Sequence, residues 1–181
     1  NKSPPTDIKS SKNTILSEDK LIHIQNFVNI FWEIGLKLES DKIIEGTQFF
    51  KNSNPPSVII TKLSNNTYGS YVNSEHKIYL CSEKYIDISS FSDGINKLLN
   101  ISNFQERQMS IREIPSISSL FLISSPMKTL FHELTHAFRQ DYGHDNISLT
   151  IRGVTDNYTF DDSGKVIASI ISEYGLYSRW I

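Results

Sequence analysis

Apolar residues recur at spacings of three and four over residues 18–40, and this periodicity predicts an amphipathic helix. Ser17 is a suitable N-cap for this helix, and Glu18 and Asp19 are favourable in its first turn. We interpret it as a scaffold helix whose Trp32 belongs to the core. The positions of its apolar face are Leu21, Ile24, Phe27, Val28, Phe31, Ile34, Gly35 and Leu38.

Three short β-branched or aromatic runs follow and predict strands. Residues 57–63 lie between a Pro-rich and an Asn-rich stretch, as is typical of a strand between two turns. Residues 68–72 and 76–81 flank a short polar segment and predict a β-hairpin. We expect the 57–81 strands to form a short, mainly antiparallel sheet whose edge strand binds an extended substrate.

Further helices are predicted in the rest of the chain. Residues 85–104 indicate a short helix, whereas residues 110–124 fit no single pattern. A clear helix begins at Ser125-Pro126 and is expected to run to about Tyr142 and to stop at Gly143. The last helix is expected over residues 165–177, with an apolar face formed by Val166, Ile167, Ile170, Ile171 and Tyr174.

These elements predict an α+β fold with a flexible polar arm over residues 1–18 and a single domain over residues 19–181. The length of 181 residues, 38% of them hydrophobic, suits one compact domain. No run approaches the roughly 18 apolar residues of a transmembrane helix. The single Cys81 excludes an intrachain disulfide, and the net charge of −2 argues against nucleic-acid binding driven by bulk charge.

An HExxH sequence, His132-Glu133-Leu134-Thr135-His136, lies inside the predicted helix that begins at Pro126. At 100° per residue the two histidines project from the same face, where two neutral imidazoles can hold one zinc ion. Glu133 can take the proton of a zinc-activated water and pass it to the leaving amine. We therefore predict a zinc hydrolase site with His132 and His136 as ligands and Glu133 as the general base. The other side of the helix would be buried by Leu130, Phe131, Leu134 and Phe138.

The third zinc ligand is left open by the sequence. The metzincin ending is absent, because Arg139 and Tyr142 stand where its Gly and His would be. Glu173 is the first choice, because it is the one Glu after the motif and lies at the edge of an apolar helix face, as in gluzincins. Asp156 is the alternative, because Gly153-Val-Thr-Asp resembles the ligand loop of aspzincins. The remaining candidates are Asp145 and His144, and the helix end would have to turn sharply to bring His144 back.

A zinc hydrolase also needs a donor that stabilises the transition-state oxyanion. Polar side chains that could donate gather after the motif, at Tyr158, Tyr174, Tyr177 and Arg179. Of these we name Tyr177 and Arg179 as the candidate catalytic residues beside Glu133.

Two segments resemble known zinc peptidases. The HELxHA core of residues 129–143, followed by Tyr-Gly, is similar to the light chains of clostridial neurotoxins. The HELxHAxR core, with Gly143 four residues after Arg139, resembles the NleD-type family of bacterial effector proteases more closely. The E-x-G-L-x-x-R stretch from Glu173 to Arg179 resembles that family too. The paired Glu-Glu-Leu of both groups is absent, since Glu173 stands alone.

The resemblance implies a small zincin-like metallopeptidase domain that holds one zinc ion through His132 and His136, with Glu133 as the general base. It implies a protein secreted by a bacterium through type III secretion, with a secretion chaperone as one partner, and acting in the host cytoplasm. A monomer is expected, because nothing in the sequence suggests an obligate oligomer. The implied substrates are host signalling proteins, namely the activation loops of JNK-type stress-activated MAP kinases. No nucleic-acid or membrane partner is expected. The alternative functions are a catalytically inert zincin-like protein that binds a host protein and, more weakly, a zinc hydrolase of non-peptide substrates.

Overall fold

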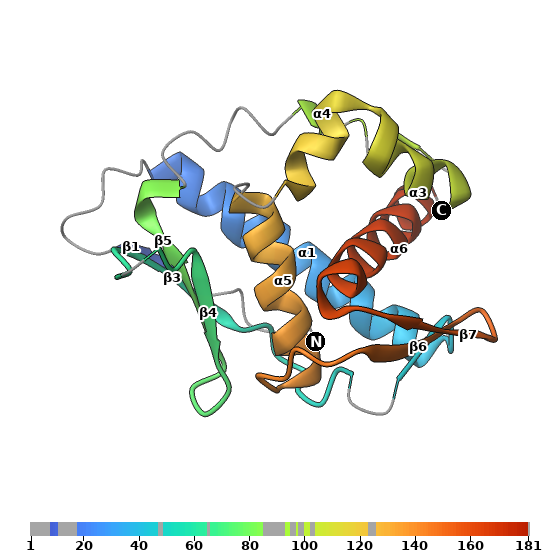
Figure 1. Ribbon diagram of the computed structural model, residues 1–181, viewed down its shortest axis with the longest axis horizontal. Coiled ribbons are helices and arrows are strands. Elements are labelled where there is room, and N and C mark those ends of the chain that lie inside the picture. Colours follow the sequence, from blue (N-terminus) through green and yellow to red (C-terminus); the bar gives the residue numbers. More distant parts are fainter. Residues whose placement is uncertain are drawn as a thin grey trace.

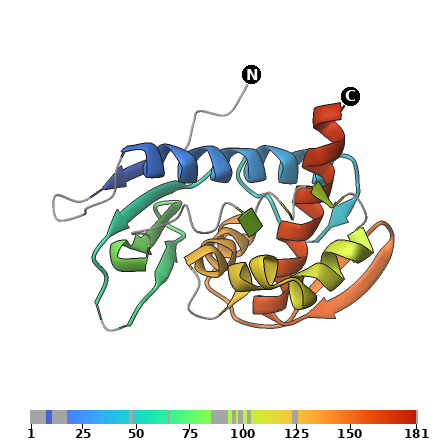
Figure 2. The ribbon, with the colours of Figure 1, turned by 90° about the horizontal axis from the view of Figure 1, so that it is seen from above.

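The structure is a computed structural model that describes residues 8–10, 18–46, 49–64, 66–84, 93–94, 97, 100–101, 104–122 and 126–180. These residues form a mixed α+β fold with two small sheets. Figure 1 shows helix α5 (Pro126–Arg139) at the centre, with a four-stranded sheet on one side and helix α6 (Phe160–Trp180) on the other. Helix α1 (Glu18–Ser40), predicted correctly, extends across the molecule from the sheet to α6 (Figure 2).

The four-stranded sheet has the order β1 (Ile8–Ser10), β3 (Ser57–Thr61), β5 (Lys77–Cys81), β4 (Gly69–Val72). The predicted hairpin is confirmed, because β4 and β5 pair antiparallel. The prediction of a mainly antiparallel sheet is wrong here, since β3 pairs with both β1 and β5 in parallel. After β3 the chain crosses to the far edge, forms β4 and turns back, so that β5 inserts beside β3 with the same direction.

Strand β1 lies inside the arm that the sequence predicted to be flexible. Its three residues pair in parallel with residues 58–60 of β3, so their backbone groups are bonded within the sheet. This part of the arm is therefore a strand. Residue 18, the last of the arm, begins α1. Residues 1–7 and 11–17, including the predicted N-cap Ser17, lie outside the described residues.

A second, antiparallel sheet was not predicted. It contains β2 (Ile44–Glu45), β6 (Ile147–Ile151) and β7 (Val154–Tyr158), in the order β2-β6-β7. A two-residue turn joins β6 to β7, and both of its residues have positive φ, 50° at Arg152 and 81° at Gly153. Two left-handed residues are what a type I′ hairpin turn requires. The segment interpreted as an aspzincin-like loop is thus a turn and a strand.

Helix α6 begins five residues before its predicted start. The Thr159 hydroxyl donates to Oδ2 of Asp162 at 2.6 Å and accepts from the Asp162 backbone N–H at 3.4 Å. This reciprocal cap satisfies a backbone donor of the first turn and extends the helix to Phe160. The predicted apolar face is otherwise confirmed, with Val166, Ile167, Ile170 and Ile171 buried.

Residues 104–121, which include most of the ambiguous stretch over residues 110–124, form three short helices that cover α5 and α6 in Figure 1. They are α3 (Phe104–Glu113), α4 (Pro115–Ser118) and the 3-10 turn η3 (Ser119–Phe121), and another 3-10 turn, η1 (Ser82–Lys84), follows β5. Most of the helix predicted over residues 85–104 lies outside the described residues, although residues 93, 94, 97 and 100 are helical. No helix in the described part of the chain is long and apolar enough to span a membrane.

The core is built around α5, as its sequence predicted. Leu130, Phe131, Leu134 and Phe138 are all buried. Trp32 is completely buried too, and its ring lies 4.8 Å from that of Phe138, centroid to centroid. This apolar packing fixes the axis and rotation of α5 and leaves its opposite side for polar residues.

Candidate metal centre

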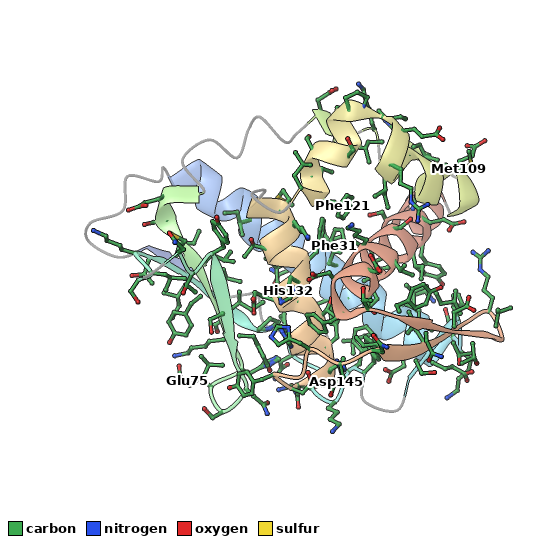
Figure 3. All side chains as sticks on the ribbon, viewed as in Figure 1. Phe31, Glu75, Met109, Phe121, His132 and Asp145 are labelled. Atoms are coloured by element: carbon green, nitrogen blue, oxygen red, sulfur yellow. The ribbon has the colours of Figure 1, made fainter. Side chains whose placement is uncertain are left out.

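Helix α5 carries the HExxH residues on the side that faces away from the apolar core. His132 is partly exposed, whereas Glu133 and His136 are buried. In Figure 3 the His132 side chain lies between the four-stranded sheet and α6. The imidazole rings of His132 and His136 have centroids 5.0 Å apart, as the i, i+4 spacing on one helix face predicts.

The end of α5 differs from the prediction that the helix continues to Tyr142 and stops at Gly143. The helix ends at Arg139, and the next residue, Gln140, has a left-handed backbone with φ of 54°. The Asp141 N–H then donates to the His136 carbonyl at 3.2 Å, which is the six-to-one bond of a Schellman cap. This sharp turn reverses the chain directly after the motif.

The reversal returns His144 to the other two histidines. Its ring centroid lies 5.5 Å from that of His132 and 5.0 Å from that of His136. One ligand atom from each of the three imidazoles lies within 4.8 Å of the other two. Three histidine nitrogens converging in this way fit the donor set of a zinc ion, which accepts imidazole ligands.

The three histidines are the one group of this kind among the residues that the structure describes. Glu173, the first choice for the third ligand, is not part of the group, whereas His144, one of the remaining candidates, is. Glu173 is buried on α6, and its Oε1 atom faces Arg152 at 3.5 Å. Asp156, the alternative, is exposed on β7. Asp145 is exposed on the loop beside His144 and does not join the group.

The loop that carries His144 is attached to the turn between β4 and β5. The hydroxyl of Tyr142 accepts a hydrogen bond from the backbone N–H of Asn73. The Tyr142 ring also lies 6.2 Å from the ring of Tyr71 on β4. His144 is thus held between α5 and the sheet by its second neighbour in the chain.

Two of the histidines have a carboxylate next to their Nδ1 atom. The Nδ1 atom of His132 lies 2.8 Å from Oδ1 of Asp161, and Nδ1 of His136 lies 3.5 Å from Oδ1 of Asp141. Arg139 in turn pairs with Asp141 at 2.9 Å. A histidine that donates through Nδ1 presents its Nε2 lone pair, and this arrangement is common around metal-binding histidines.

Burial keeps the two helix histidines neutral. It lowers the pKa of His136 to about 3, with a further contribution from the neighbouring imidazoles and Arg139. It also lowers the pKa of His132, although the carboxylate of Asp161 opposes this effect. The buried ring of Phe160 covers the group, with its centroid 4.0 Å from that of His136. Neutral imidazoles are the form that binds a metal ion.

Glu133 lies beside the histidines and against the edge strand β4. Its Oε1 atom is 3.9 Å from Nε2 of His132, and its carboxylate accepts a hydrogen bond from the backbone N–H of Tyr71. Burial raises the pKa of this carboxyl group to about 7, although the Tyr71 bond acts in the opposite direction. A carboxyl group with a pKa near neutrality can both accept and return a proton.

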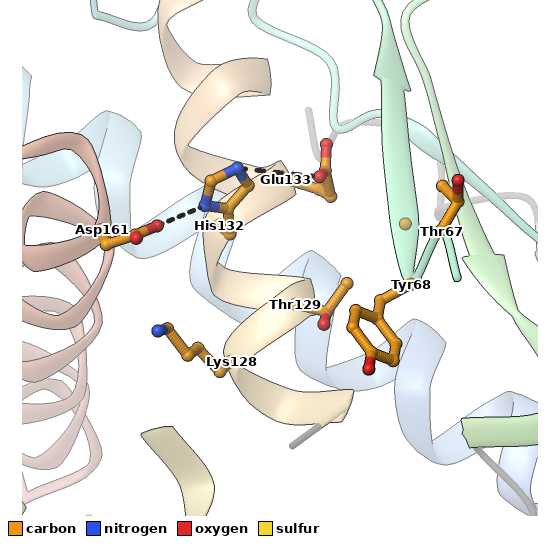
Figure 4. Close-up of a pocket in the computed structure, with 8 residues that line it drawn as sticks. Thr67, Tyr68, Lys128, Thr129, His132, Glu133 and Asp161 are labelled. Atoms are coloured by element: carbon orange, nitrogen blue, oxygen red, sulfur yellow. Dashed lines mark hydrogen bonds and ion pairs between the residues drawn. The ribbon is translucent and has the colours of Figure 1, made fainter. Parts of the chain in front are cut away.

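A cleft of about 390 Å³ opens beside Glu133 and His132 (Figure 4). One wall is the start of β4, and the other comes from α5 and the first turn of α6. The lining residues are Thr67, Tyr68, Gly69, Lys128, Thr129, His132, Glu133 and Asp161. The group that could exchange protons therefore faces a space large enough for part of a substrate.

Of the predicted oxyanion donors, the two whose side chains are described, Tyr158 and Tyr174, do not line this cleft. The hydroxyl of Tyr174 donates to Asp41 at 2.8 Å, and that of Tyr158 to Asp156 at 3.5 Å. Tyr177 and Arg179 belong to the last turns of α6, and their side chains lie outside the described part of the structure.

The residues outside the HExxH motif that contact its side chains were not predicted from the sequence. Asp161 and Phe160 come from the start of α6, which lies before the start predicted for this helix. Asp141 stood in the predicted helix, and the backbone of Tyr71 carries no sequence signal. The cap formed by Thr159 and Asp162 is the signal that could have indicated the earlier start of α6.

The chain matches no protein-family model, no curated protein and no solved structure.

Proposed function

We propose that this protein is a zinc-dependent endopeptidase. The observation that carries the proposal is the group of three imidazoles, from His132, His136 and His144, next to the buried carboxyl group of Glu133. Three protein ligands and an open fourth position are typical of catalytic rather than structural zinc sites. A cleft leads to this group, as a substrate requires.

The donor set fits zinc rather than a harder cation. All three candidate ligands are imidazoles, whereas magnesium and calcium prefer oxygen ligands. When bound, zinc would lower the pKa of a coordinated water to about 7 and polarise the scissile carbonyl.

Glu133 acts in this proposal as the proton carrier. Its carboxylate takes a proton from the nucleophilic water and later gives it to the leaving amine. The backbone N–H of Tyr71 orients the carboxylate, and burial keeps its pKa near neutrality. Asp161 and Asp141 position the imidazoles of His132 and His136 through their Nδ1 atoms.

The edge strand β4 supports a peptide as the substrate. Among the described residues β4 is the last strand of its sheet, so one side of its backbone has no strand partner. An extended peptide can add to such an edge through main-chain hydrogen bonds. Gly69 at the start of β4 lines the cleft together with Glu133, so a peptide bound along β4 would pass the proton carrier.

A helix that carries the catalytic residues beside an edge strand also supports a zincin-like fold for the domain. The resemblance to NleD-type effector proteases supports secretion by a bacterium and action in a host cell. Activation loops of JNK-type MAP kinases are therefore the first substrates to test.

The deciding experiment compares the native protein with Glu133→Gln, after both are loaded with zinc. We expect the substitution to lower peptide cleavage by about 10²–10⁴-fold, because it removes the proton carrier. Zinc binding should be unchanged, since Glu133 is not one of the three imidazole ligands. A random peptide library and a recombinant JNK-type kinase serve as substrates.

Glu45→Gln is a suitable control, because Glu45 is exposed on β2 and does not line the cleft. Full activity of the Glu133→Gln protein would overturn the proposed mechanism. Absence of cleavage by the zinc-loaded native protein on both substrates would overturn the proposed function.

A further inference from the structure

We propose that Lys128 sets the substrate preference of this cleft and selects peptides with an acidic side chain within about two residues of the scissile bond. The inference rests on the proposed endopeptidase function. It concerns the half of the cleft that extends from His132 toward the start of α5, where Lys128 lines the wall (Figure 4).

The position of Lys128 follows from the helix. It precedes His132 by four residues, so it lies on the same face, about 6 Å away along the axis at 1.5 Å per residue. An extended peptide advances about 3.3 Å per residue. A peptide that lies along α5 and β4 therefore brings a side chain one or two residues from the reacting bond next to Lys128.

The charge of Lys128 is not neutralised within the described part of the molecule. No ion pair joins its ammonium group to a carboxylate there, although Asp161 and Glu133 line the same cleft. Both of these acids have other partners. Asp161 binds Nδ1 of His132 at 2.8 Å, and Glu133 accepts from the backbone of Tyr71.

The remaining side chains of this half of the cleft are uncharged. Thr67 and Tyr68 line the cleft directly before β4, and Thr129 follows Lys128 on α5 (Figure 4). Lys128 is also partly buried, so its charge is less screened by water than that of an exposed lysine. A carboxylate on the substrate is the group that completes this environment, and the flexible lysine stem adapts to its position.

The experiment maps cleavage sites in a random peptide library for the native protein and for Lys128→Glu. We expect Asp and Glu to be cleaved roughly fivefold more efficiently than Lys and Arg at one fixed position within two residues of the bond. The charge reversal should invert the preference at that position and leave the others unchanged. Lys62→Glu is the matched control, because Lys62 is exposed and does not line the cleft.

A second measurement makes the test independent of catalysis. Two peptide pools, identical except that one carries Asp and the other Lys at every charged position, are titrated against zinc-loaded Glu133→Gln protein with and without Lys128→Glu. Tighter binding of the Asp pool that reverses in the Lys128→Glu protein supports the inference even if no peptide is cleaved.

The two possible failures are distinct. Cleavage without any acidic preference, or a preference that Lys128→Glu does not alter, overturns the role of Lys128 and leaves the endopeptidase function standing. Equal binding of both pools overturns the role of Lys128 as well. Absence of cleavage with retained pool selectivity overturns the endopeptidase function alone.

Discussion

The Nδ1 atom of His132 lies 2.8 Å from the Oδ1 atom of Asp161, although the two residues are 29 positions apart in the chain. The contact joins helix α5, which carries the HExxH residues, to the first turn of α6. With Nδ1 donating to the carboxylate, His132 is fixed in the tautomer whose Nε2 is free to bind a metal ion.

Replacing Asp161 by Ala should therefore weaken zinc binding. Loss of such an outer partner costs about 10–100-fold in metal affinity, and we expect a decrease in this range. Competition with a chelating dye measures it. Asp156→Ala is the control, because Asp156 is exposed on β7 and is not in the histidine group. Equal zinc affinities of the two variants would show that the contact with His132 does not matter.

The identity of the third ligand gives a second prediction. His144→Ala should lower zinc affinity by more than the roughly 10–100-fold expected for an outer partner, because it removes a ligand itself. Glu173→Gln should leave zinc affinity unchanged, because Glu173 faces Arg152 instead. Metal analysis after dialysis distinguishes the two variants. Loss of zinc from Glu173→Gln with retention in His144→Ala would restore the ligand set expected from the sequence.

Local patterns predicted much of the fold. The position of α1 followed from apolar periodicity, the start of α5 followed from its Ser-Pro capping signal, and the β4–β5 hairpin followed from two strand-like runs around a polar turn. The parallel pairing of β3 with β5 could not be predicted in this way. It depends on where the chain crosses between strands, and no local pattern encodes that crossing.

Only the part of the candidate site that lies on helix α5 could be predicted from the sequence. His132, Glu133 and His136 share a face of α5 because of their spacing. The approach of His144 depends on the left-handed backbone of Gln140, a conformation that Gln adopts rarely and that the sequence assigned to Gly143 instead. Glu173 was chosen because it is the one Glu after the motif and lies at the edge of an apolar helix face, but neither feature determines its partner, which is Arg152.

Gly69 gives a third prediction, because β4 approaches α5 closely at this residue. A Cβ atom at position 69 would lie 2.7 Å from Cγ2 of Thr129 and 3.3 Å from Cγ of Glu133. Gly69→Ala should therefore destabilise the protein by about 1–3 kcal/mol, the usual range for overpacking, and displace Glu133. Urea unfolding and peptide cleavage measure the two effects.

Thr129→Ser provides the matching test of the Gly69 contact, because it removes the methyl group that an alanine at position 69 would meet. The double variant Gly69→Ala with Thr129→Ser should recover part of the lost free energy of unfolding. Strictly additive effects of the two substitutions would argue against a direct steric contact.

His76 makes the stability of the metal-free protein depend on pH. Its Nδ1 accepts from the Tyr71 hydroxyl at 2.8 Å, and its Nε2–H donates to the Asn54 carbonyl at 2.7 Å. This arrangement requires a neutral ring, and burial lowers the pKa of His76 below its ordinary value of 6.5. Because the unfolded chain binds the proton first, the contribution of His76 is present above pH 6.5 and is lost as the pH falls toward the lowered pKa.

His76→Asn should therefore reduce the slope of stability against pH below 6.5. Asn tolerates the left-handed backbone of this position, where φ is 50°, so the turn itself is preserved. Urea unfolding of both proteins with a chelator, at about pH 7.5 and about pH 5.5, measures the difference. His132 and His136 have lowered pKa values as well, so part of the slope should persist in the variant. Parallel stability curves for the two proteins would show that His76 is not protonated on unfolding in this range.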